Sequence, residues 1–329
     1  MDERKAMPAL YPLRFAPIFK RYLWGGRGLQ SLLAKRLGPG DDYAESWEVV
    51  DRGRDQSIVT HGPLAGTTLG ELVSRRGGEL FGRHAAEPRF PLLFKFLDAH
   101  LPLSVQVHPD DAAAARLHPP DLGKSEAWVI LAADPGSYVF AGLKRGFDRA
   151  ALARELARGT CELCLHRLEP RAGDVLFLPA GAVHALGPGL VVAEIQQASD
   201  TTYRLFDWNR LGPDGRPRQL HVEESLSAID YRLGPLSFSA PCPSERPHVE
   251  RLVDCDKFVL NRWKLDSQQS IGGDEKCRLI VVLDGSLEAA SDPAGPLAKG
   301  EVSLLPASLG AVLLKPRGGA ILLEISLPD

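Results

Sequence analysis

One segment of the chain occurs twice, and this repeat restricts the fold more than any other feature. Residues 173–184 and 300–311 share a frame of a glycine, five residues, a proline, one residue, a small residue and two further residues. The two copies lie at a constant offset of 127 residues. The first copy ends on His184 and the second on Ala311. The repeat predicts two related small barrels, of which only the first keeps a potential metal ligand.

The predicted fold is mainly β, with two jelly-roll barrels and a few short helices. The 32 glycines and 26 prolines are spread along the 329 residues, which is typical of short strands joined by tight turns. The length exceeds one typical domain. We predict an N-terminal barrel with helical insertions over residues 1–232, a linker over 233–250 and a C-terminal barrel over 251–329. Helices are expected at residues 69–81, 110–117, 147–158 and 221–229, and a hairpin turn is expected at Asp284 and Gly285.

Composition and charge exclude several classes of partner. The net charge is -3 and no dense Lys/Arg block is present, so neither nucleic acid nor an anionic membrane is an expected partner. No apolar run approaches the roughly 18 residues of a membrane span, and the first 17 residues lack the apolar core of a signal peptide. We therefore expect a cytoplasmic protein. Five cysteines are an odd number, which argues against a disulfide framework, and Cys161 and Cys164 are interpreted as ordinary strand cysteines. The oligomeric state is left open.

A polar face on a short strand gives the first indication of a site. Residues 103–108 alternate between apolar and polar side chains. Successive side chains of a strand point to opposite faces, so Ser104, Gln106 and His108 should share one face. Leu103, Val105 and Val107 should share the other. A second strand, residues 124–131, should place Lys124, Glu126 and Trp128 on one face.

These residues combine with the repeat into a predicted metal site. The frame that ends on His184 is the second sequence signature of the cupin barrel, in which the proline and glycine turn the chain and the histidine projects inward. A set of two histidines, one carboxylate and one amide oxygen suits Zn²⁺, and also manganese, iron or cobalt. We predict one Zn²⁺ per chain, bound by Gln106, His108, Glu126 and His184. A mononuclear iron cupin oxygenase and a non-catalytic sugar-binding cupin are the alternatives.

Further motifs lie at residues 22–26, 45–48, 94–98, 103–110, 123–128, 179–184 and 199–204, and His221 is the last match of the first barrel. Together these motifs resemble the type I mannose-6-phosphate isomerases, most closely the short bacterial form. The resemblance runs through nearly the whole chain, and this chain lacks the long helical insertion of larger members. It implies a metal-dependent isomerase that interconverts D-mannose 6-phosphate and D-fructose 6-phosphate, with one zinc on the four ligands named above.

The resemblance also implies roles for residues beyond the metal ligands. Arg204 corresponds to the active-site arginine of the family, while Lys95, Lys124 and Ser104 correspond to residues that line its pocket. We expect these three to receive the phosphate, and we expect Asp200, within the 199–204 motif, to contact the substrate.

The reaction requires a base as well as a metal. A proton must move between C1 and C2 through an enediol(ate), which a metal and the cationic Arg204 would stabilise. Lys124 and Glu194 are the two possible bases. We favour Lys124, and Glu194 would then orient Arg204. The remaining histidines are interpreted as structural: His61, His84, His100, His118, His166, His221 and His248.

Overall fold

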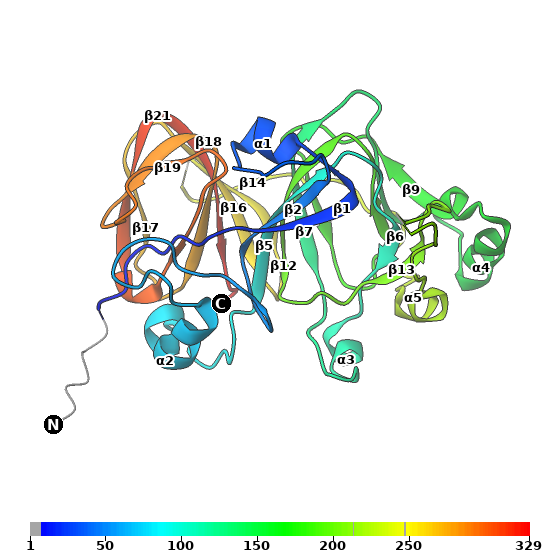
Figure 1. The fold of residues 1–329 in the computed structure, drawn as a ribbon, viewed down its shortest axis with the longest axis horizontal. Coiled ribbons are helices and arrows are strands. Elements are labelled where there is room, and N and C mark those ends of the chain that lie inside the picture. Colours follow the sequence, from blue (N-terminus) through cyan, green and yellow to red (C-terminus); the bar gives the residue numbers. More distant parts are fainter. Residues whose placement is uncertain (1–7, 213, 247) are drawn as a thin grey trace. The chain divides into compact units, whose positions relative to one another are not determined.

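The computed structural model describes residues 8–212, 214–246 and 248–329, and antiparallel strands dominate this part of the chain (Figure 1). Contacts divide the described residues into two units. We call residues 19–47 and 92–240 the His184 unit, and residues 8–18, 48–91 and 241–329 the Ala311 unit, after the last residue of each copy of the repeat. Among the described helices, none has the length and apolar character that a membrane crossing requires.

The two units differ from the predicted boundaries at 232 and 251. Residues 8–18 and 48–91, which we placed in the N-terminal barrel, belong to the Ala311 unit. Leu13 forms a backbone bridge with Leu304, and Gly82 forms one with Lys276. Backbone groups can pair with partners that are distant in sequence, and single bridges of this kind connect the early segments to residues near the end of the chain.

The His184 unit contains two antiparallel sheets rather than one closed sheet. Both are jelly-roll sheets whose neighbouring strands are distant in sequence. In order across the first sheet, the described strands are β1 (Ile18–Gly26), β2 (Tyr43–Val49), β5 (Leu92–Ala99), β12 (Leu190–Gln197), β7 (Glu126–Ala133) and β10 (Val175–Leu178). In order across the second, they are β13 (Tyr203–Phe206), β6 (Val105–Val107), β11 (His184–Leu186), β8 (Val139–Leu143) and β9 (Leu165–Leu168).

Short helices accompany these sheets; three of them lie within predicted ranges, whereas the helix at residues 28–33 was not predicted. They are α1 (Gly28–Leu33), α3 (Asp111–Ala114), α4 (Arg149–Arg158), α5 (Val222–Ala228) and the 3-10 turn η1 (Cys161–Cys164). Asp110 and Asp148 cap α3 and α4 by accepting hydrogen bonds from backbone N–H groups of the first turn. The predicted CxxC strand is wrong, because Cys161 and Cys164 lie in η1.

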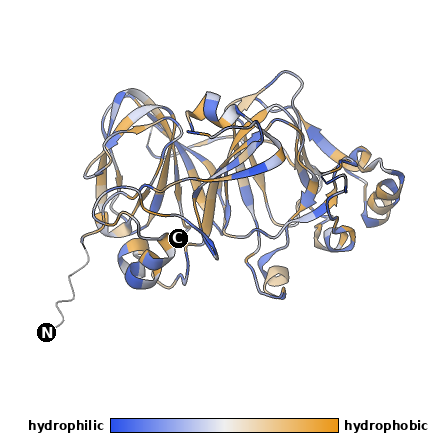
Figure 2. Ribbon diagram, viewed as in Figure 1, coloured by the Kyte–Doolittle hydropathy of each residue, from blue (hydrophilic) through white to orange (hydrophobic). Residues whose placement is uncertain are grey.

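Two apolar clusters fix the second sheet in place. One cluster joins the first sheet to β8 and β11, and includes Trp128 and Leu186. The other joins Val105 and Val107 of β6 to Leu152 of α4 and to Leu226 of α5. Figure 2 shows both hydrophobic and hydrophilic residues on these helices, as expected for helices that bury one face. Strand β6 therefore buries its valines on one face and leaves its other face to polar residues.

The Ala311 unit is built on one eight-stranded sheet within the described residues. Helix α2 (Leu69–Phe81) has the predicted bounds, and Thr68 and Glu71 form a capping box at its start. The remaining elements are β3 (Asp51–Arg52), β4 (Asp55–Gln56), β14 (Cys242–Pro243), β15 (Val249–Asp254), β16 (Val259–Leu265), β17 (Gln269–Gly272), β18 (Arg278–Ala289), β19 (Leu297–Ala298), β20 (Val302–Leu305), the 3-10 turn η2 (Ala307–Leu309) and β21 (Ala311–Ser326).

The predicted hairpin at Asp284 and Gly285 is wrong. Strand β18 continues through both residues, and its register with β21 shifts on either side of them. Gly285 has φ +72°, and a Cβ there would lie 2.1 Å from the carbonyl oxygen of Gly319. The Asp-Gly pair therefore forms a bulge in a long strand and not a turn between two strands.

The repeat itself is confirmed by the strands that it forms. Strand β10 covers Val175–Leu178 and β20 covers Val302–Leu305, while β11 begins at His184 and β21 begins at Ala311. All of these bounds keep the offset of 127 residues found in the sequence.

Candidate active site

A cavity of about 330 Å³ lies within the His184 unit. The predicted site residues converge on it from separate strands and loops. Those that line it are Lys95, Ser104, Gln106, Lys124, Glu194, Asp200 and Arg204.

Strand register explains why these residues meet. On the second sheet, Gln106 of β6 pairs with His184 of β11 on one side and with Arg204 of β13 on the other. On the first sheet, Glu194 of β12 pairs with Lys95 and with Trp128. Paired residues of neighbouring strands point to the same face, so each sheet presents a row of three side chains.

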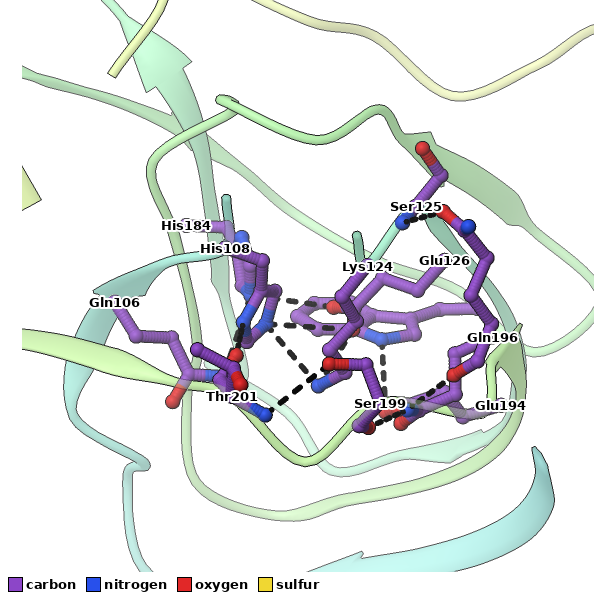
Figure 3. Close-up of polar contacts among 12 residues, drawn as sticks. Gln106, His108, Lys124, Ser125, Glu126, His184, Glu194, Gln196, Ser199 and Thr201 are labelled. Carbon is purple, nitrogen blue, oxygen red and sulfur yellow. Dashed lines mark hydrogen bonds and ion pairs between the residues drawn. The ribbon is translucent and has the colours of Figure 1, made fainter. Parts of the chain in front are cut away.

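Three buried side chains form a compact cluster with the chemistry of a metal site. The ligand atoms of His108, Glu126 and His184 all lie within 4.8 Å of one another. His184 Nε2 is 3.2 Å from Glu126 Oε1, and His108 Nε2 is 3.5 Å from Glu126 Oε2. Figure 3 shows both imidazoles directed toward Glu126 and Lys124.

The second nitrogen of each imidazole fixes which atom can bind a metal. His108 Nδ1 lies 2.9 Å from the carbonyl oxygen of Thr201, and His184 Nδ1 lies 2.9 Å from that of Ala182. A carbonyl can only accept, so each ring carries a proton on Nδ1, and Nε2 is the atom of each ring that faces Glu126 and could bind a metal. Backbone carbonyls hold metal-binding histidines in this way in many proteins.

Burial and neighbouring charges favour the protonation states of His108 and Glu126 that can bind a metal, the neutral imidazole and the ionised carboxylate. Burial and the neighbouring Lys124 ammonium hold the pKa of His108 well below its usual range, so its ring stays neutral. Burial alone would raise the pKa of Glu126, but Lys124, His184 and His108 outweigh it and hold that pKa well below its ordinary value. Both carboxylate oxygens of Glu126 are buried without a hydrogen-bond partner. Lone pairs of two imidazoles and a carboxylate thus face one another, an arrangement that a divalent cation would stabilise.

Gln106 lies at the edge of this cluster. Its side-chain amide nitrogen is 3.3 Å from His184 Nε2, and its amide oxygen is 3.5 Å from Ser104 Oγ. The predicted alternation holds for residues 104–108, but Leu103 is an exception, because it lines the cavity instead of joining Val105 and Val107. Strand β6 begins only at Val105, so the period-two pattern does not extend to Leu103.

Comparison with known proteins supports what this geometry indicates. The pattern of the family described as phosphomannose isomerase type I, catalytic domain, matches residues 13–129. The chain is 34% identical over 315 residues to the mannose-6-phosphate isomerase ManA of Bacillus subtilis, covering 92% of this chain and 96% of that protein. The chain belongs to the type I phosphomannose isomerase family.

Further relatives agree in sequence and in fold. A mannose-6-phosphate isomerase of Streptococcus mutans is 33% identical over 276 residues, which cover 83% of this chain and 85% of that protein. The crystal structure of a Bacillus subtilis mannose 6-phosphate isomerase superposes with a TM-score of 0.88 at 30% identity, covering 96% of this chain and 99% of that one. The predicted cupin fold and the predicted family resemblance are both confirmed.

In this member of the phosphomannose isomerase family, the two predicted lysines are held by carboxylates. Lys124 Nζ lies 3.0 Å from Glu126 Oε2 and 3.1 Å from His108 Nε2. Lys95 Nζ lies 3.2 Å from Glu45 Oε2 and 3.2 Å from Glu194 Oε1. Burial alone would lower the pKa of Lys95, but Glu194 and Glu45 outweigh it and raise that pKa, so Lys95 remains a cation.

Glu194 and Arg204 lie on opposite sheets of this isomerase-family cavity. Glu194 accepts a hydrogen bond from Trp128 Nε1 at 3.1 Å, and burial raises its pKa although Lys95 opposes this. Arg204 donates from Nη1 to the carbonyl oxygen of Gln219 at 3.1 Å, and its Nε is buried without a partner. Burial and the positive charge of Arg218 lower the pKa of Arg204.

Sequence reasoning missed several cavity residues of this family member. His221, which we interpreted as structural, lines the cavity, and its Nδ1 accepts a hydrogen bond from the backbone N–H of Arg204 at 3.2 Å. Trp24, Glu45 and Arg218 also line it. A signal was available for three of these four, since Trp24 and Glu45 lie in segments that carry the family resemblance and His221 ends it.

Proposed function

We propose that this chain catalyses the interconversion of D-mannose 6-phosphate and D-fructose 6-phosphate. One observation carries the proposal: a buried cluster of imidazole and carboxylate lone pairs borders a cavity lined by lysine and arginine. Relatives named for this reaction match more than nine-tenths of the chain in the case of ManA. The cavity, at about 330 Å³, suits a small ligand such as a hexose phosphate.

We assign the metal to His108, Glu126 and His184, with Gln106 as the fourth ligand. The unpartnered oxygens of Glu126 and the fixed tautomers of both histidines support this set. The Gln106 amide would turn its oxygen toward the position near His184 that its nitrogen now occupies. Mixed nitrogen and oxygen ligands in a four-residue set suit Zn²⁺, one ion per chain, although other divalent metals fit the same donors.

We assign the remaining cavity residues to charge stabilisation, proton transfer and substrate contacts. When bound, the metal supplies Lewis acidity toward the sugar oxygens where negative charge develops. Arg204, which pairs with Gln106 on the neighbouring strand, adds a permanent positive charge near the metal ligands. We assign proton transfer to Lys124, whose Nζ lies at the metal ligands, with Glu194 as the alternative. Ser104 and Asp200 line the cavity and are assigned to substrate contacts.

We propose for Lys95 a role other than the phosphate binding that the sequence suggested. Its ammonium is shared between Glu45 and Glu194, and it is only 7% exposed. We propose that it fixes the orientation of Glu194 and does not bind phosphate directly.

We also propose a cytoplasmic location. Four cysteines of the described residues are free thiols: Cys161, Cys164, Cys255 and Cys277. Unpaired cysteines in this number are typical of proteins from reducing compartments.

A coupled assay tests the proposed function. Metal-replete protein should form fructose 6-phosphate from mannose 6-phosphate, activity should fall after chelation, and Zn²⁺ should restore it. Arg204→Ala should lower kcat by about 100- to 1000-fold, because a cation close to the developing charge is lost. Metal content should stay at one ion per chain in that variant.

Three outcomes would each overturn part of the proposal. Inactive but metal-replete wild-type protein that still binds the sugar phosphate would indicate a sugar-binding cupin. Iron as the bound metal, together with oxygen consumption, would indicate an oxygenase. Undiminished turnover by Arg204→Ala would exclude the role given to that residue.

A further inference from the structure

Arg218 enters the cavity from the segment between β13 and α5, and one carboxylate holds it there. Its Nε donates to Asp207 Oδ2 at 2.7 Å and its Nη2 donates to Asp207 Oδ1 at 2.6 Å. This two-point contact fixes the plane of the guanidinium. Within the described residues, Nη1 of Arg218 donates to no protein group. A preoriented donor therefore borders the cavity.

A second guanidinium lies close by with donors to spare. Arg204 has a buried Nε without a partner, and its Nη1 is its one side-chain donor with a protein acceptor among the described residues. The positive charge of Arg218 contributes, after burial, to the lowered pKa of Arg204, as expected for neighbouring cations. Arg204 also pairs in register with Gln106, so it links the metal-ligand cluster to Arg218.

Positive charge exceeds negative charge at this end of the cavity. Arg210 donates from Nη2 to Asp207 and from Nη1 to the carbonyl oxygen of Pro102, so it supports Asp207 and does not line the cavity. Arg210 and Arg218 both donate to Asp207, whose negative charge also acts on Arg204, and Asp200 is a further carboxylate that lines the cavity. Three cations against two anions leave one positive charge without a partner, which an anionic ligand would balance.

The lysines of the cavity offer no comparable position. Lys95 contacts two carboxylates and Lys124 contacts Glu126, so a phosphate at either lysine would also meet negative charge. We propose that Arg218, fixed by Asp207, binds the phosphate group of the sugar phosphate. This inference rests on the proposed function and specifies how the same cavity recognises its substrate. Arg218 would then determine specificity for phosphorylated over unphosphorylated sugars.

Steady-state kinetics of the metal-replete enzyme test the role of Arg218. Arg218→Ala should raise the KM for mannose 6-phosphate by roughly 10- to 100-fold, because charge-assisted hydrogen bonds to the phosphate are lost. Its kcat should stay within about threefold of wild type, since the reacting carbons lie at the metal end. The constant for competitive inhibition by inorganic phosphate should rise by the same factor as KM. Arg218→Lys should show a smaller increase, because it keeps the charge but not the fork.

Arg216→Ala is the matched control. Arg216 is an exposed arginine on the same segment and does not line this cavity, so its loss removes the same charge from the same loop. Wild-type KM and wild-type phosphate inhibition are expected for it. Equal changes in Arg216→Ala and Arg218→Ala would show a long-range charge effect and overturn the inference.

Other results separate this inference from the proposed function. A fall in kcat at constant KM would place Arg218 at the reacting end and overturn its phosphate role. If Arg218→Ala melts at a lower temperature than wild type, Arg218→Lys provides the folded variant, and unchanged phosphate inhibition in it would contradict the proposal. If wild-type enzyme shows no isomerase activity, the proposed function fails, and calorimetric binding of inorganic phosphate to wild type and Arg218→Ala still decides whether Arg218 binds phosphate.

Discussion

Equivalent strands of the His184 unit and the Ala311 unit pair with buried residues of opposite charge. Leu178 of β10 pairs with Glu126, whereas Leu305 of β20, the corresponding residue of the repeat, pairs with Arg278. The same place in each sheet thus holds an acid in one unit and a base in the other. His184 begins β11, and the exposed Ala311 begins β21.

The Ala311 unit satisfies its buried charges internally. Arg278 Nε donates to Glu324 Oε1 at 2.7 Å, while Trp263 Nε1 and Asn261 Nδ2 donate to Glu324 Oε2 at 2.8 Å and 3.0 Å. In the His184 unit, Glu126 Oε2 lies 3.0 Å from the Lys124 ammonium, but neither carboxylate oxygen of Glu126 has a hydrogen-bond partner, and both face imidazole nitrogens. Arg278 therefore satisfies Glu324 from within the chain, whereas Glu126 keeps acceptors that a bound metal would satisfy. This difference indicates that metal binding by a copy of the repeat depends on buried carboxylate oxygens that have no hydrogen-bond partner in the protein.

Replacing His184 by alanine gives the His184 unit the residue of its counterpart and should have the largest effect. We expect His184→Ala to lose the metal and to lower kcat/KM on the order of 10,000-fold, because a Lewis acid contributes several kcal/mol to such a transition state. Elemental analysis and the coupled assay would measure both quantities. Stoichiometric metal in His184→Ala would contradict the ligand assignment.

Ala311→His is the reciprocal control. It restores the histidine of the repeat in the Ala311 unit, but Arg278 occupies the place of Glu126 there. Bound metal should remain at one ion per chain. A second ion in Ala311→His would show that the histidine alone decides metal binding and that the charge reversal is irrelevant.

The next largest effect should come from breaking the internal ion pair of the Ala311 unit. Arg278 and Glu324 are 8% and 7% exposed, so Arg278→Met leaves a buried carboxylate without its cation. We expect a loss of about 3–5 kcal/mol in the free energy of unfolding, measured by urea denaturation. Arg317→Ala, which breaks an exposed pair with Glu288 in the same unit, should cost less than about 1 kcal/mol. Equal costs in the two variants would show that burial is not the cause.

Local sequence patterns were sufficient to predict those features of the fold that depend on local backbone geometry. The polar face of Ser104, Gln106 and His108 follows from the alternation of a strand, and helix α2 follows from its apolar period and its cap. The sequence repeat indicated that two segments would fold alike, and in the structure β10 and β20 have equal lengths while β11 and β21 begin at equivalent residues.

Long-range packing determined what the sequence patterns could not. Gly285 forms a bulge because β21 pairs with β18 on both sides of it, and no local feature distinguishes this from a turn. Leu13 pairs with Leu304, a partner almost three hundred residues away in the chain. Asp207 accepts two hydrogen bonds from Arg218 at the cavity, and an arginine in a polar loop carries no sequence signal of that contact.

Buried thiols provide the finest comparison between the two units. Burial raises the pKa of Cys161 to about 12 in the His184 unit, and it raises the pKa of Cys277 to about 12 in the Ala311 unit. The reactive form of a thiol is the thiolate, so at pH 8 only about one molecule in 10,000 is reactive at either position while its unit stays closed. The rate of alkylation at Cys161 or Cys277 therefore reports local unfolding of the unit that contains it.

Removing the metal should accelerate labelling of Cys161 by roughly 10- to 100-fold and leave Cys277 unchanged. Cys161 belongs to the apolar cluster that contains Val183 and Ala185, the neighbours of His184 in the chain. A ligand at about 100 times its Kd stabilises the bound state by about 2.7 kcal/mol, which sets the upper end of this range. Peptide mass spectrometry after timed alkylation would measure both rates, with the exposed Cys242 as the reference for reagent activity. Equal acceleration at Cys161 and Cys277 would show that the metal stabilises both units together. The two units would then differ in metal-binding chemistry but not in their stabilisation by the metal.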